Sequence, residues 1–220
     1  MASLQCERKE EEVVGAAHIS SEEKASLDEI IKHAEDSYVS EDVVAKHGGH
    51  GLCTAGGHDH GLSAEDRMVG GINLGFRIVA IAGGLKNQTK GSLKISDSKK
   101  WAGHVVKNFP NPLSNMGAFS FSAMSATGVK AGVAYAGKNR AGVECAWLLA
   151  FADTTATKRR IYAECGPKSK FNRIDWAKIE QKLVNAGQLA KASDKATGTS
   201  VYATITGSSG KDVVAAAFTG

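Results

Sequence analysis

Six side chains able to bind a metal ion fall within one short glycine-rich stretch: His47, His50, Cys53, His58, Asp59 and His60. Imidazole and thiolate ligands together suit zinc or copper. If the backbone is locally extended, the imidazoles of His58 and His60 would lie on the same side of it. The glycines would let the chain wrap around an ion, but the spacing matches no established zinc signature. The stretch therefore predicts either a zinc or copper site or a histidine-rich linker.

Other catalytic patterns are absent from the sequence. It contains no Gly-x-Ser-x-Gly motif and no phosphate-binding loop, and Cys145 stands in an apolar run where a thiol is usually inert. Four cysteines are too few for a disulfide scaffold, so we expect free thiols. The amino terminus is charged where a secretory signal would be apolar, which favours a cytoplasmic or nuclear protein. No apolar run approaches the ~18 residues of a membrane span.

Charge divides the chain into two parts. Residues 1–66 hold 5 basic and 15 acidic groups, a net charge of −10. Residues 67–220 hold the other 22 basic and 8 acidic groups, a net charge of +14, although the whole chain carries only +4. A basic surface can attract nucleic acid or an anionic membrane, or it can serve solubility alone. The acidic part could also neutralise the basic part, within one chain or between the subunits of a homo-oligomer.

The elements that must position these groups change character near residue 66. Ser20-x-x-Glu23 has the form of a capping box at a helix start. Apolar residues follow at helical spacing: Leu27, Ile31, Ala34 and Tyr38. The dense glycines of residues 47–61 end this pattern. We therefore predict an acidic, partly helical or mobile arm over residues 1–66 and a basic domain over residues 67–220.

The sequence of the basic domain predicts a series of short strands. Alternating or continuous apolar segments separated by turn residues lie at 73–82, 92–96, 102–107, 117–122, 131–137, 144–153, 159–165, 200–206 and 212–219. The run from Trp147 to Phe151 is apolar throughout, which predicts a central strand covered on both faces. One helix, capped by Asn172 or Asp175, is predicted to begin near Trp176. The pattern favours a mainly β fold, a two-sheet antiparallel sandwich with one or two flanking helices.

Part of the basic domain resembles the jasmonate-induced proteins of plants. The stretches that carry the resemblance are Asn87-Gln-Thr-Lys-Gly-Ser-Leu93, Gly103-His104, Phe109-Pro110-Asn-Pro112, Asn115-Met-Gly117-Ala-Phe119, Gly132-Val-Ala-Tyr135 and Trp147-Leu-Leu-Ala-Phe151. The chain departs from the family pattern at Phe119-Ser-Phe121-Ser, where an aromatic–histidine pair is usual. The resemblance implies a stress-responsive protein with an actinoporin-like β-sandwich, a fold shared with lipid-binding and pore-forming proteins. It does not supply an activity.

Two functions remain open from the sequence. The first is a non-catalytic stress or defence protein whose sandwich binds a lipid headgroup, a glycan or another small ligand, drawn by its basic charge to anionic surfaces. Its predicted contacts are Trp101, His104, Phe109 and Tyr135. The second is a metal-dependent enzyme in which the histidine-rich loop meets the sandwich, with Asp59 supporting the metal ligands or acting as a base. Nucleic-acid binding is disfavoured, because no recognition motif accompanies the charge.

Overall fold

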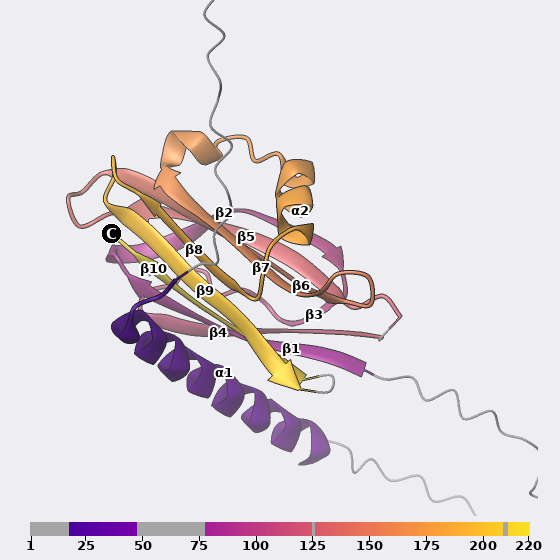
Figure 1. The fold of residues 1–220 in the computed structure, drawn as a ribbon. Helices are drawn as coiled ribbons and strands as arrows, with labels where there is room; N and C mark the ends of the chain where they lie inside the picture. Colours follow the sequence, from indigo (N-terminus) through magenta and orange to yellow (C-terminus); the bar gives the residue numbers. More distant parts are fainter. Residues whose placement is uncertain (1–17, 48–77, 125, 209–210) are drawn as a thin grey trace, which may run out of the picture.

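The computed structural model describes residues 18–47, 78–124, 126–208 and 211–220, and this part of the chain forms two facing sheets (Figure 1). The six-stranded sheet has the order β3 (His104–Lys107), β4 (Met116–Met124), β1 (Ile78–Gln88), β10 (Lys211–Thr219), β9 (Thr199–Ser208) and β8 (Leu189–Asp194). The four-stranded sheet has the order β2 (Lys90–Ala102), β5 (Val129–Lys138), β6 (Glu144–Thr154) and β7 (Lys158–Pro167). Two α-helices, α1 (Ser21–His47) and α2 (Trp176–Val184), and the short 3-10 helix η1 (Lys168–Phe171) flank them. The predicted mainly β two-sheet fold is confirmed.

The main core lies between the two sheets. Large side chains from both sheets are buried there, including Tyr135, Trp147 and Phe218. The rings of Phe119 and Phe151 stack across the interface with their centroids 5.4 Å apart. Trp147 also joins the sheets directly, since its Nε1 donates a hydrogen bond to the carbonyl oxygen of Thr219, 3.0 Å away. The apolar positions that alternate along the strands are therefore the ones that face this interface.

Strand β6 is covered on both faces, as its continuous apolar run predicted. Trp147, Leu149 and Phe151 face the inter-sheet core, whereas Leu148 and Ala150 face α2 and η1 on the outer side. Helix α2 begins where the sequence indicated, because the side chain of Asp175 accepts a hydrogen bond from the backbone nitrogen of Lys178. The buried free thiols Cys145 and Cys165 were also predicted.

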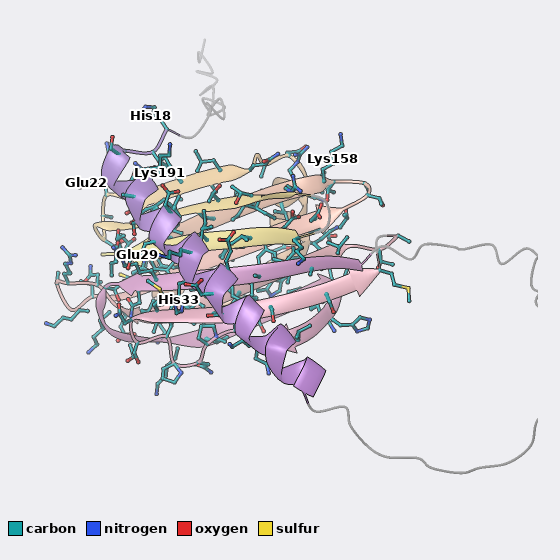
Figure 2. The ribbon with its side chains drawn as sticks, turned by 90° about the horizontal axis from the view of Figure 1, so that it is seen from below. His18, Glu22, Glu29, His33, Lys158 and Lys191 are labelled. Carbon is teal, nitrogen blue, oxygen red and sulfur yellow. The ribbon has the colours of Figure 1, made fainter. Side chains whose placement is uncertain are left out.

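Helix α1 covers the outer face of the six-stranded sheet. The capping box is present: the Ser20 backbone nitrogen donates to Glu23 Oε2 at 2.8 Å, and the Glu23 nitrogen donates to Ser20 Oγ at 3.2 Å. Leu27 and Ala34 of the predicted stripe are buried, but Ile30, which that stripe omitted, is fully buried and Ile31 only partly. Figure 2 shows α1 lying across the strands, with Lys191 beside its first turn.

Within the described part of the chain, two ion pairs fasten α1 to the sheet, and both join an acidic side chain of the helix to a lysine of the basic part. Lys86 Nζ lies 2.6 Å from Glu29 Oε2, and Lys191 Nζ lies 2.8 Å from Glu23 Oε2. Part of the acidic segment is thus neutralised within the chain. The predicted boundary near residue 66 lies outside the described residues.

Two features of the sheets were not predicted. Strand β8 has the sequence LAKASD, which lacks the β-branched and aromatic residues typical of strands, and it pairs only with β9 at the sheet edge. Strands β1 and β10 pair in parallel, whereas every other pairing between described strands is antiparallel. Parallel neighbours need a long crossover, and here the intervening chain builds the second sheet. In the described part of the chain, no helix has the length and apolarity needed to cross a membrane.

Candidate functional site

The four predicted ligand contacts do not gather into one site. Tyr135 is fully buried in the core, where its hydroxyl donates to the carbonyl oxygen of Pro110 at 2.7 Å and burial raises the pKa of its phenol. Phe109 packs on Phe119 in the same core, with ring centroids 4.6 Å apart. Trp101 is half-buried on the outer face of the four-stranded sheet, and His104 is exposed on β3. Tyr135 therefore presents no surface to a ligand, because it occupies an inward position of β5.

The predicted metal ligands cannot be placed. Most of them lie outside the described residues: His50, Cys53, His58, Asp59 and His60. The backbone of His47 is described, but its side chain is not. Within the described part of the chain, no group of three histidine, cysteine, aspartate or glutamate side chains could hold a metal ion. Zinc or copper binding by the histidine-rich stretch stays a prediction.

A hollow of about 480 Å³ lies where β2, β5 and β6 meet η1. Its lining is dominated by lysines and small polar residues: Lys90, Gly91, Ser92, Lys94, Ile95, Ser96, Ala136, Gly137, Lys138, Glu144 and Lys168. Because Tyr135 points into the core, the alternation along β5 places Ala136 and Lys138 on the outer face of the sheet. The hollow therefore opens on the side of the molecule opposite to α1.

An irregularity in β2 shapes this hollow. Lys90 pairs with Lys138 and Lys94 pairs with Ala136, so residues 91–93 of β2 stand opposite the single residue 137 of β5. Gly91 adopts a φ of +81°, a left-handed conformation that favours glycine. Leu93 turns into the core and exchanges two backbone hydrogen bonds with Leu113, of 2.9 and 2.8 Å. The bulge thus carries Lys90 and Lys94 to the same hollow from either side of a buried leucine.

Asn87 anchors the chain that enters the bulge. Its Nδ2 donates to the carbonyl oxygens of Gly91, Leu113 and Ser114 at 2.7, 3.0 and 3.2 Å. Its Oδ1 accepts from the backbone nitrogen and the hydroxyl of Thr89 at 2.9 and 2.7 Å. Asn87 is buried, so these contacts replace the water that its amide would otherwise bind. The turn that presents Lys90 is therefore held from inside the protein.

The charges of the hollow are unbalanced. Lys168 pairs with Glu144, with 3.2 Å between Nζ and Oε2, and both side chains are about half exposed. Lys90, Lys94 and Lys138 are exposed and form no ion pair within the described part of the chain. Lys90 and Lys138 are direct cross-strand neighbours, and like charges at such positions repel each other. The lining can therefore bind an anion, which would relieve this repulsion.

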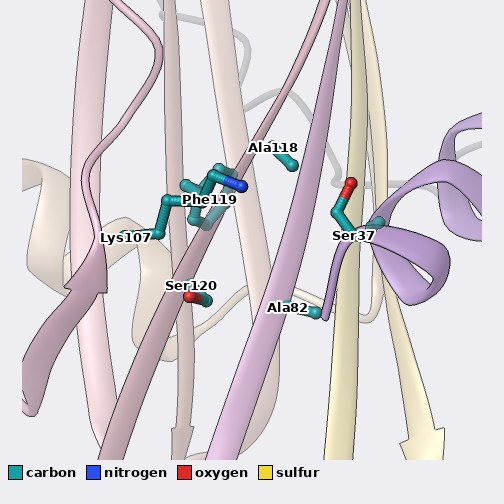
Figure 3. Close-up of a pocket in the computed structure, with 7 residues that line it drawn as sticks. Ser37, Ala82, Lys107, Ala118, Phe119 and Ser120 are labelled. Atoms are coloured by element: carbon teal, nitrogen blue, oxygen red, sulfur yellow. The ribbon is translucent and has the colours of Figure 1, made fainter. Parts of the chain in front are cut away.

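Two other hollows are less suited to a ligand. One of about 360 Å³ is lined by Asn139, Arg140, Ala141, Thr197, Gly198, Thr219 and Gly220, with one cationic side chain. The other is a narrow gap between α1 and the six-stranded sheet, beside Ala34, Ala82 and Ser120 (Figure 3). This gap has no interior space for a water molecule. The lysine-lined hollow is therefore the candidate site.

The comparisons with known proteins place the chain in a family. No family model matches it. A jasmonate-induced protein homolog from Atriplex canescens is 32% identical to it over 157 residues, which cover 67% of this chain and 83% of the relative. The chain belongs to the jasmonate-induced protein family. Among solved structures, this family member is similar to the lipid-binding protein Nakanori, with a TM-score of 0.53 and 12% identity over 64% of this chain and 71% of that one. The similarity to Nakanori concerns the fold alone.

Stretches that carry the family resemblance build the hollow in this jasmonate-induced protein. The stretch from Asn87 to Leu93 supplies the anchor, Lys90 and the bulge, and Tyr135 ends the run that leads into Lys138. Sequence reasoning found these stretches but missed the lysines. The Asn87-x-Thr89 spacing, which is typical of a turn closed by an asparagine side chain, was the available signal.

A second charged cluster holds η1 and α2 against β7, and so positions Lys168. Glu164 accepts hydrogen bonds from Tyr162 Oη, from Lys182 Nζ at 2.6 Å and, as an ion pair, from Lys170 Nζ at 3.1 Å. Burial alone would raise the pKa of Glu164, but the contacts with Lys182, Tyr162 and Lys170 outweigh it and hold that pKa below its usual value. Burial, with the contact to Glu164, raises the pKa of Tyr162.

Replacing Glu164 by glutamine is expected to lower the free energy of unfolding at pH 7 by about 1–2 kcal/mol. A carboxylate whose pKa is lowered on folding contributes stability above its unfolded pKa of about 4.3, and this is lost as the pH falls through the folded pKa. The variant should therefore lose part of the acid dependence of the wild type. Urea unfolding as a function of pH measures both effects. The control is Glu144→Gln, whose exposed ion pair contributes about 0–1 kcal/mol; equal effects of the two changes would contradict the assignment.

Proposed function

We propose that this protein is a non-catalytic, stress-related binding protein whose lysine-lined hollow receives an anionic lipid headgroup. The observation that carries the proposal is a hollow of about 480 Å³ in which Lys90, Lys94 and Lys138 meet, none of which forms an ion pair within the described part of the chain. The lining offers ammonium groups, which bind anions. Membership of the jasmonate-induced family supports the stress-related role, and the fold shared with a lipid-binding protein supports a lipid as ligand.

The charge distribution favours one orientation on an anionic surface. Helix α1, whose exposed carboxylates include Glu22, Asp28 and Glu35, covers the six-stranded sheet, on the side of the molecule away from the sheet that carries the hollow (Figure 1). An anionic membrane repels that side and attracts the lysines. Trp101, half-buried on the same outer face as the hollow, remains a candidate additional contact.

Sedimentation with vesicles that mix phosphatidylcholine and anionic phospholipids tests the proposal at low ionic strength. We expect the wild type to bind and the triple variant Lys90→Gln/Lys94→Gln/Lys138→Gln to lose about ten-fold or more in affinity. The matched control is Lys99→Gln/Lys100→Gln/Lys195→Gln, which removes the same charge from exposed lysines outside the hollow. Equal losses in the two triple variants, or no binding by the wild type, would overturn the proposal.

A further inference from the structure

We infer that the hollow selects a phosphomonoester, a terminal phosphate with no cation of its own. This inference rests on the proposed function and specifies its ligand. A phosphomonoester carries a charge of about −1.5 to −2 at neutral pH and has three strong acceptor oxygens. A phosphodiester carries one charge and only two such oxygens. Lys90, Lys94 and Lys138, which form no ion pair within the described part of the chain, offer one ammonium group to each of the three oxygens of a monoester.

The charge of the hollow supports this choice. Four lysines stand against one carboxylate, and that carboxylate, Glu144, is already engaged by Lys168. Lys90 and Lys138 are cross-strand neighbours, a position at which like charges repel each other. A doubly charged phosphate between them adds two attractions against this one repulsion, and each is about twice as strong as the attraction of a singly charged phosphate at the same distance.

The lining also disfavours headgroups that carry an ammonium group beside the phosphate. Such a group binds over an aromatic ring or against a free carboxylate. Among the described residues that line the hollow there is no aromatic ring, and the carboxylate of Glu144 is paired. A choline or ethanolamine cation bound here would instead meet the lysine ammonium groups. Zwitterionic phospholipids are therefore disfavoured for two reasons: the lysines repel their ammonium group, and the lining offers that group no partner.

The test compares vesicles of matched surface charge. One set contains phosphatidic acid, a phosphomonoester, and the other contains phosphatidylglycerol, a phosphodiester, each diluted in phosphatidylcholine until their zeta potentials agree. We expect wild-type protein to bind the phosphatidic acid vesicles about ten-fold more tightly, and the Lys90/Lys94/Lys138→Gln variant to lose this preference. Pure phosphatidylcholine vesicles should not bind. Equal affinity for the two anionic sets would overturn the inference and leave the proposed function standing; no binding to either would overturn both.

Two further experiments test the same inference, one with a variant and one with a soluble competitor. Glu144→Gln removes the carboxylate and frees Lys168, so it should increase the affinity for phosphatidic acid vesicles about three-fold or more. A loss of affinity in this variant would contradict the charge argument.

Competition with soluble glycerol 3-phosphate distinguishes the source of the phosphate. Displacement from vesicles in proportion to its concentration assigns recognition to the phosphomonoester itself; displacement no better than that by an equal ionic strength of chloride overturns the inference.

Discussion

Replacing Gly83 by alanine is expected to lower the free energy of unfolding by about 3 kcal/mol. Gly83 lies in β1 opposite Phe119 of β4, and a β-carbon placed on it would come within 2.0 Å of Phe119 Cζ. That ring has no free direction in which to move, because it is buried and packs against Phe109 and Phe151. Relief of the clash must displace either the aromatic cluster or β1 itself, which pairs with strands on both sides.

Urea denaturation of Gly83→Ala measures this effect, and Gly187→Ala is the matched control. A β-carbon on Gly187 would have only ordinary contacts, at 3.8 Å or more, so its change in stability should stay within about 0.5 kcal/mol. Combining Gly83→Ala with Phe119→Leu should cost less than the two single changes added together, since the smaller side chain makes room for the methyl group. Additive effects in the double variant would show that Gly83 and Phe119 do not meet as described.

The parts of the fold that could be predicted are those encoded by local pattern. The alternation of Phe119 and Phe121, the apolar run of β6 and the cap of α2 each require only neighbouring residues to be read. Strand β8 was missed because an edge strand with one neighbour needs little apolar surface, and its alternation is correspondingly weak. The parallel pairing of β1 and β10 was missed because strand direction follows from the path of the whole chain.

The candidate site could not be predicted from the sequence for a similar reason. Lys90, Lys94, Lys138 and Lys168 are ordinary surface lysines in the sequence, and only the bulge and the position of η1 bring them together. The burial of Tyr135, one of the predicted ligand contacts, could not be predicted either. Tyr135 alternates with small residues along β5, which identifies a face but does not say whether that face is the inner or the outer one.

Replacing Asn87 by alanine is expected to lower the free energy of unfolding by about 3 kcal/mol and to weaken binding to anionic vesicles. The change removes all five hydrogen bonds of the side chain at once. It also takes one of two donors from the carbonyl oxygen of Leu113, which keeps the backbone nitrogen of Leu93, and it releases the turn that presents Lys90. Five hydrogen bonds of a buried amide are lost together, which is why the effect exceeds that of a surface asparagine.

Chemical denaturation and vesicle sedimentation separate the two consequences of Asn87→Ala. Both are measured at a temperature below the thermal unfolding of the variant. Asn108→Ala, at an exposed asparagine, serves as the control and should change stability by less than about 0.5 kcal/mol. Asn87→Asp should be at least as damaging as the alanine variant, because it turns a donor toward three carbonyl oxygens into an acceptor. If Asn87→Asp is instead tolerated, the amide does not anchor the turn, and the position of Lys90 must depend on the backbone pairings of Lys90 with Lys138 and of Leu93 with Leu113.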